Sequence, residues 1–194
     1  MPRYTDLQLD ALRELANIGS GTASTALSSM LGRSIDISVP SAYVLPMAEA
    51  VEAVGAPEDD ATGVVLGVFG DMPASVLLLL DPHDARLMCG LLGVDAATDI
   101  GTSALLEIGN IVGTSYLNAL AEMTGMVLEP TPPASATDML GAIVQTVLVQ
   151  RAGAGDIALL LDSDLVVEGE DCSVSFLLVP DEGGVEQLLA RLGL

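Results

Sequence analysis

Lysine and tryptophan are absent from this chain of 194 residues, and histidine occurs once. The chain has six Arg against 16 Asp and 11 Glu, so its net charge is −21. Nucleic-acid binding needs clustered Lys or Arg to neutralise phosphates, so this composition excludes a nucleic-acid partner and argues against binding to an anionic membrane. An acidic surface without lysine is typical of proteins that work in concentrated salt, where counterions screen the self-repulsion.

Cysteine and long apolar segments are also scarce. Cys89 and Cys172 stand apart from each other and from His83, which predicts two buried thiols and no metal site. We expect His83 to lie on the surface or to cap a helix. Residues 1–10 lack the apolar segment of a signal peptide, and no run of 18 apolar residues predicts a membrane span. These absences indicate a cytoplasmic protein without a membrane partner.

The chain contains an internal repeat, which should be sought before any fold is assigned. Residues 10–40 align without a gap to residues 103–133, at an offset of 93. Ten of the 31 aligned positions are identical, among them Glu14/Glu107 and Asn17/Asn110. Two copies at such a long period are too few for a solenoid. We therefore predict one domain, residues 1–194, made of two homologous halves at about 6–93 and 99–193.

Each copy begins with an amphipathic helix that carries a narrow polar stripe. At about 100° per residue, the stripe positions fall within about 60° of one another, and the apolar positions fall on the opposite side. The first stripe consists of Asp10, Glu14, Asn17 and Gly21, and the second of Ser103, Glu107, Asn110 and Thr114. The predicted buried faces are Leu12, Leu15, Ala16, Gly19, Ala23, Ala26, Leu27 and Met30, and Leu105, Ile108, Val112, Tyr116, Ala119, Leu120 and Met123.

The acid and the amide of each stripe are three residues apart, so they lie side by side and can address one object. A merely solvated helix face would keep polar residues, but it has no reason to keep an acid and an amide at both matched places. About two thirds of the aligned positions differ between the copies. The doubled pair therefore favours a function for Glu14, Asn17, Glu107 and Asn110.

The motif Asp10-x3-Glu14-x2-Asn17 and its second copy, Ser103-x3-Glu107-x2-Asn110, resemble the signature of the CheC, CheX and FliY phosphatases of chemotaxis. The two-copy layout over nearly the whole chain resembles CheC in particular. This resemblance implies a phosphatase that acts on the aspartyl phosphate of a CheY-type response regulator. It implies that Glu14 and Glu107 pair with the active-site lysine of the partner.

An aspartyl phosphate needs little covalent assistance, because a water in line with the departing carboxylate and stabilisation of the phosphoryl charge are enough. A side-chain amide can hold such a water with its oxygen. We assign that role to Asn17 and Asn110. The partner supplies the phosphorylated Asp and Mg²⁺, so no cofactor is expected in this chain. Asp10 and Ser103 are expected to cap or orient the helix or to touch the partner, and Gly21 to leave room for it.

The predicted fold class is α+β, with two long helices packed on a central, mainly antiparallel sheet and with short additional helices. Gly19 is expected to permit close packing on this sheet. Residues 41–60 read as irregular or partly strand, and residues 162–164 as a turn. Helices are predicted at residues 6–31, at 83–92 with Asp81 as N-cap, at 102–124, and from Pro180 to Gly193. Strands are predicted at residues 34–39, ended by Pro40, at 63–70 and 74–81 as a hairpin, and at 126–129, 142–150, 156–161 and 173–179.

Two other functions are compatible with parts of the sequence. CheC-like proteins also resemble partners of the receptor deamidase CheD, so the chain could be a binding module that regulates a CheD-type enzyme. Alternatively, Glu14 and Glu107 could form a paired-carboxylate hydrolase site as in glycosidases, which requires them within about 10 Å of each other. Because both copies of the motif are already in one chain, we expect a monomer.

Overall fold

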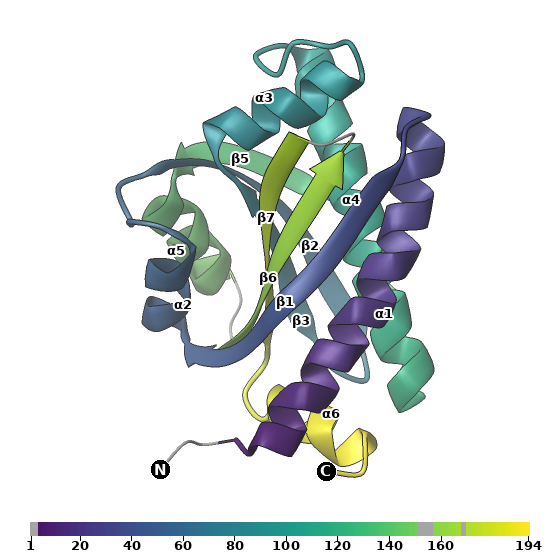
Figure 1. Ribbon diagram of the computed structural model, residues 1–194. Coiled ribbons are helices and arrows are strands. Elements are labelled where there is room, and N and C mark those ends of the chain that lie inside the picture. Colours follow the sequence, from purple (N-terminus) through teal and green to yellow (C-terminus); the bar gives the residue numbers. More distant parts are fainter. Residues whose placement is uncertain (1–3, 151–156, 168–169) are drawn as a thin grey trace.

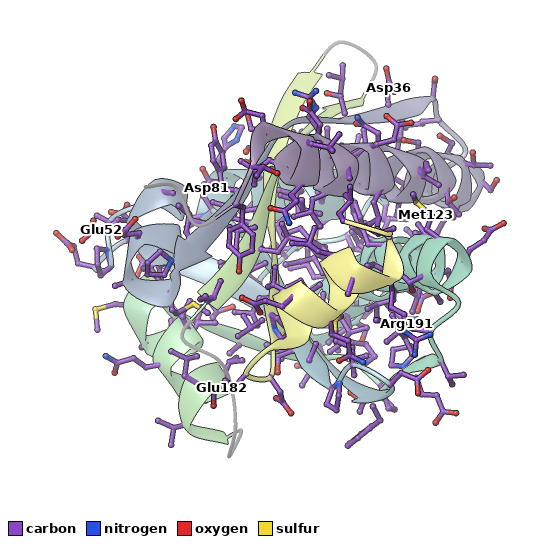
Figure 2. The ribbon with its side chains drawn as sticks, turned by 90° about the horizontal axis from the view of Figure 1, so that it is seen from below. Asp36, Glu52, Asp81, Met123, Glu182 and Arg191 are labelled. Atoms are coloured by element: carbon purple, nitrogen blue, oxygen red, sulfur yellow. The ribbon has the colours of Figure 1, made fainter. Side chains whose placement is uncertain are left out.

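The computed structural model describes residues 4–150, 157–167 and 170–194. Within these residues, six helices surround one sheet of seven strands (Figure 1). Helices α1 (Asp6–Leu31) and α4 (Asp99–Thr124) cover one face of the sheet, and α2 (Met47–Val54) and α5 (Leu140–Gln150) cover the other (Figures 1 and 2). Helices α3 (Pro82–Leu91) and α6 (Gly184–Arg191) lie at opposite ends. No helix in the described residues is long and apolar enough to cross a membrane.

The sheet is antiparallel at every described pairing, in the order β1-β6-β7-β3-β2-β4, with β5 also paired to β2. Its strands are β1 (Ile35–Pro46), β2 (Asp60–Gly70), β3 (Ala74–Leu80), β4 (Leu128–Pro130), β5 (Ala134–Met139), β6 (Ile157–Val167) and β7 (Glu170–Pro180). All residues of β3 are buried because this central strand is covered on both faces. Alternate β3 side chains enter two hydrophobic cores, one under α1 and α4 and one under α2 and α5.

The strand order has the symmetry that a duplication would produce. When β1 is exchanged with the β4–β5 pair, β6 with β2, and β7 with β3, the result is the same strand order read from the opposite edge of the sheet. Both halves also run in the sequence long helix, edge strand, short helix, hairpin, short helix. The fold class is confirmed as α+β. The origin of the two halves as homologous copies stays a prediction.

Helices α1 and α4 pack side by side and run antiparallel (Figure 1). The start of α1 and the end of α4 meet at α6: Tyr4 donates a hydrogen bond to Glu186, and Asp71 links Gln187 to Val127. The two helices come close together at Gly19, where an added methyl group would lie 2.7 Å from Tyr116 Cδ1 and 3.0 Å from its Cα. The prediction that Gly19 packs on the sheet is therefore wrong, because Tyr116 lies there instead.

Several local predictions are confirmed. Helix α1 spans the predicted residues and ends at Gly32, which adopts the left-handed conformation at φ 65°. Strands β2 and β3 form the predicted hairpin. Asp81 caps α3 by accepting a hydrogen bond from the Asp84 amide, and Pro82 is the first helical residue. Helix α4 ends as predicted before Gly125 but begins three residues earlier than expected, because Thr98 is its N-cap.

Two short helices contradict the sequence predictions. Residues 142–150 were expected to form a strand but belong to α5, whose buried side chains Ile143, Val144 and Val147 follow a helical spacing. Their β-branched character favours a strand locally, but packing on the sheet decides the conformation. Part of the region expected to be irregular, residues 41–60, is α2, with Met47, Ala50 and Val51 buried.

Two strand predictions were also wrong, and one strand was missed. Pro40 does not end β1; instead the register shifts between Ser38 and Ser41, which is where an edge strand tolerates a proline. The predicted turn at residues 162–164 is part of β6, because the backbones of β1 and β7 pair with it on both sides. The strand expected at 126–129 is confirmed as β4, which begins two residues later, whereas β5 was not predicted. Asp156, the first residue of another expected strand, lies outside the described residues.

Candidate functional site

The two polar stripes lie on the outer face of α1 and α4, away from the sheet. Asp10, Glu14, Asn17 and Gly21 are all exposed in the first stripe. In the second stripe Ser103 and Glu107 are exposed, whereas Asn110 and Thr114 are half-buried. The opposite faces are mostly buried as predicted, but Met123 is 39% exposed, so its expected place in the core is wrong. The two sites are thus similar in chemistry and unequal in accessibility.

The acid and the amide of each stripe are not engaged within the molecule. Among the residues that the structure describes, the side chains of Glu14, Asn17, Glu107 and Asn110 have no hydrogen-bond or ion-pair partner. Exposed polar side chains bond to water without cost, so this observation alone is not evidence of function. It does show that both pairs are available to a partner and that neither is needed to hold the helices in place.

A hydroxyl group one turn beyond each Asn bonds to that residue's backbone. Ser20 Oγ donates to the Asn17 carbonyl at 2.8 Å, and Thr114 Oγ1 donates to the Asn110 carbonyl at 2.6 Å. The hydroxyl residue and the glycine exchange places between the copies, because Ser20 aligns with Gly113 and Gly21 with Thr114. As a result, the first stripe is open beyond its amide, whereas Thr114 stands beyond the second.

The residues that open the two motifs have different contacts. Asp10 Oδ1 accepts a hydrogen bond from Arg13 Nη2 at 2.9 Å in an exposed ion pair. Ser103 Oγ donates to the Asp99 carbonyl at 2.9 Å within the first turn of α4. Neither contact involves the Glu or the Asn of its motif. Asp10 and Ser103 therefore share a position in the repeat but not a local role.

The antiparallel packing places the two motifs on opposite sides of the Gly19–Tyr116 contact. At 1.5 Å rise per residue, Asn17 and Asn110 are about 12 Å apart along the helix axes, and Glu14 and Glu107 about 21 Å. A glycosidase-type pair of carboxylates acts across a single sugar ring at a separation below about 10 Å. The geometry therefore does not support that alternative and leaves two separate sites.

The structure extends the repeat upstream of the predicted motif. Thr5 and Thr98 are the N-caps of α1 and α4, and each accepts a hydrogen bond from an amide three residues later. Their successors match as well: Asp6-Leu7 in the first copy and Asp99-Ile100 in the second. Sequence reasoning missed this agreement because the alignment began at residue 10. Extending it by five residues would have found both caps.

Asp81, His83 and Asp84 form another grouping of polar side chains, with ligating atoms within 4.8 Å of one another. Hydrogen bonds within the protein account for their arrangement. Asp81 caps α3, while Asp84 accepts one hydrogen bond from the Ser173 amide and approaches His83 Nδ1 at 3.3 Å. Cys172 lies beside this group, and burial together with the Asp84 charge raises the pKa of its thiol to about 12.

The chain has relatives of known family. The model of the CheC-like family matches residues 7–44 and 100–135, which include both motifs. The protein named CheY-P phosphatase CheC, from Bacillus subtilis, is 31% identical over 96% of this chain and 94% of its own length. This chain belongs to the CheC-like family.

Other members extend the comparison. The flagellar motor switch phosphatase FliY of B. subtilis is 26% identical over 66% of this chain and 35% of its own length. The crystal structure of Thermotoga maritima FliY superimposes with a TM-score of 0.75 at 21% identity and covers 98% of both chains. The fold of the family member described here is therefore that of FliY. The residues that the family resemblance singled out in the sequence lie on the outer faces of α1 and α4, exposed except for the half-buried Asn110 and Thr114.

Proposed function

We propose that this chain is a hydrolase that removes the phosphoryl group from the aspartyl phosphate of a CheY-type response regulator. One observation carries the proposal: the same acid and amide lie at the same place on the outer faces of two long helices, and neither pair is engaged within the described molecule. Membership of the CheC-like family and the 31% identity to a relative named CheY-P phosphatase CheC support it.

In the proposed mechanism, the amides of Asn17 and Asn110 each orient the attacking water. The amide oxygen accepts a hydrogen bond from the water, and the NH₂ group reaches the phosphoryl oxygens. Water forms the new bond to phosphorus while the bond to the aspartyl oxygen breaks, so the aspartate leaves as a carboxylate and inorganic phosphate keeps both protons of the water. The gain comes from positioning, which is the main requirement of phosphoryl transfer.

Glu14 and Glu107 are proposed to fix the partner in register. Each lies one turn before its Asn on the same face, so a carboxylate bound to a lysine beside the phosphorylated Asp would place the amide over the phosphoryl group. The Mg²⁺ that neutralises phosphoryl charge belongs to the partner. The absence of lysine and the strongly acidic surface of this chain suit a partner that presents a cation.

The test is the rate of phosphate release from a phosphorylated CheY-type regulator in high salt. Wild type is compared with Asn17→Ala, Asn110→Ala and the double variant. Asn118→Ala is a matched control, because Asn118 is also exposed on α4 but lies outside the motif. The proposal expects the control to match wild type and the double variant to lose all stimulated release.

The same variants separate catalysis from binding alone. If the chain is a binding module for a CheD-type deamidase, its docking should survive loss of both amides and no stimulation of phosphate release should be seen with wild type. If wild type stimulates phosphate release and this stimulation depends on Asn17 and Asn110, the chain acts as the phosphatase. Binding of the phosphorylated regulator without any release would leave only the binding module.

A further inference from the structure

A large apolar side chain is exposed at the beginning of both long helices. Leu7 on α1 is 66% exposed and Ile100 on α4 is 67% exposed. The two residues are equivalent in the repeat, since each is the second residue after the N-cap threonine of its helix. Single exposed apolar residues are ordinary on protein surfaces. A matched pair with nearly equal exposure, in copies that differ at about two thirds of their positions, is not explained in that way.

Both side chains lie on the same helix face as the proposed sites. Leu7 precedes Glu14 by seven residues and Ile100 precedes Glu107 by seven, which is two helical turns and brings the side chains into line. Each apolar residue is about 10 Å from its Glu along the axis. On this face, each helix is therefore apolar in its first turn and polar further along, at the Glu and the Asn.

We propose that Leu7 and Ile100 are apolar docking residues for the phosphorylated response regulator, one at each site. This inference rests on the proposed function, because the occupant is the protein that binds at Glu14 and Asn17. A specific interface covers about 800 Å² on each partner, which corresponds to a patch about 16 Å in radius. A regulator held over the Glu of either motif must therefore cover the apolar residue 10 Å away.

The complementary surface on the regulator is an apolar patch beside its phosphorylation pocket. The polar part of the stripe contacts the charged pocket, and Leu7 or Ile100 supplies the desolvated contact from which such interfaces gain much of their affinity. The proposal divides the work within each site: the Asn acts in the chemical step, the Glu sets register and the apolar residue contributes affinity.

The experiment compares wild type with Leu7→Ala, Ile100→Ala and the double variant. Alanine favours helix and both side chains are largely exposed, so these variants should fold. Val149→Ala is the matched control, because Val149 is 85% exposed on α5, on the opposite face of the sheet. Affinity is measured with a CheY-type regulator carrying beryllofluoride and Mg²⁺ as a stable mimic of the acyl phosphate. Phosphate release is measured with the phosphorylated regulator.

We expect the double variant to weaken binding and raise KM about tenfold, with kcat at saturating regulator unchanged. The control should match wild type. Unchanged affinity in the double variant would overturn this inference even if phosphate release depends on the two Asn residues. If the double variant loses affinity but wild type does not stimulate phosphate release, the docking role of Leu7 and Ile100 is supported and the proposed phosphatase function is wrong. If wild type binds no regulator, both proposals fail.

A second copy of this chain is the competing occupant, and sedimentation tests it. If the substitutions convert a dimer to a monomer and leave regulator affinity unchanged, the apolar residues form a homodimer interface and the inference is wrong. If the chain sediments identically before and after substitution and affinity falls, the regulator is the occupant.

Discussion

Replacing Gly21 by alanine is expected to stabilise the protein and to impair the first site. Gly21 is exposed in the middle of α1, and an added methyl group would meet no atom within 4 Å. Alanine is favoured over glycine in a helix interior by about 1 kcal/mol. With an m-value of about 2 kcal/mol/M, the urea midpoint should rise by about 0.5 M. No contact within the described residues requires a glycine at this position, so we predict that the free space is used by the partner.

The same substitution, Gly21→Ala, should slow phosphate release at the first site. Gly21 lies one turn beyond Asn17 on the stripe, and a methyl group inserted into a closely packed interface costs about 1–3 kcal/mol. Phosphate release by the first site alone is measured in an Asn110→Ala background. We expect kcat/KM to fall about tenfold there when Gly21→Ala is added. Thr114 occupies the equivalent place in the second site, so the unmodified second site should already be the slower one.

Two other glycines serve as controls. Gly90→Ala in α3 also meets open space, so it should stabilise without changing phosphate release. Gly19→Ala should destabilise, because its methyl group would lie 3.0 Å from the Cα of Tyr116, which belongs to the backbone of α4 and cannot turn aside. The reasoning is refuted if Gly21→Ala is destabilising, or if it stabilises and leaves phosphate release in the Asn110→Ala background unchanged.

Three further predictions concern the scaffold. Ser24→Ala should cost about 1 kcal/mol in unfolding by urea, because Ser24 Oγ accepts the Ile37 amide at the open edge of β1 at 2.9 Å; an unchanged midpoint would contradict this. The pKa of Cys172 is raised from 9.0 to about 12 by burial and by Asp84, so stability from the protonated thiol is complete below pH 9 and lost as the pH rises toward 12. Urea midpoints between pH 8 and 11 should fall more steeply for wild type than for Cys172→Ala, and parallel curves would refute the assignment. Circular dichroism should show loss of fold at low ionic strength and its recovery in molar salt, and full structure at low salt would contradict the inferred high-salt adaptation.

The acidic charge that motivates the salt prediction is not confined to one side of the molecule. Asp36 on β1, Glu52 on α2 and Glu182 before α6 are exposed on different sides of the molecule (Figure 2). Charges separated by more than about 10 Å repel one another in dilute buffer and are screened when salt is added. This excess of negative charge on several sides of the molecule is distinct from the local chemistry of Glu14 and Glu107.

Where local signals were strong, the sequence predicted the structure well. The boundaries of α1, the cap at Asp81 and the β2–β3 hairpin follow from turn and capping residues that act over a few positions. The failures arose where packing overrides local preference. Helix α5 is rich in β-branched residues, and β6 continues through an acidic segment because strands on both sides pair with its backbone. Helix α2 is different, since its Met47, Ala50 and Val51 spacing was visible and was not used.

The candidate site was predictable because it lies within single helices. A stripe defined by i, i+3 and i+4 positions needs no knowledge of long-range contacts, so Glu14 and Asn17 could be placed on one face from the sequence alone. The separation of the two sites could not, because it depends on the antiparallel contact between Gly19 and Tyr116. The unequal exposure of Asn17 and Asn110 likewise appears only once the helices are packed.

The most direct test of the account is the decay of the regulator's acyl phosphate at saturating concentrations of this chain. Wild type, Asn17→Ala, Asn110→Ala and the double variant are compared, with Asn118→Ala as control. The account predicts that wild type accelerates the decay and that each single variant retains part of this acceleration. Asn17→Ala should retain less of it than Asn110→Ala. The double variant should lose all acceleration while the regulator still binds. Acceleration that persists in the double variant would contradict the central claim that these two amides perform the hydrolysis.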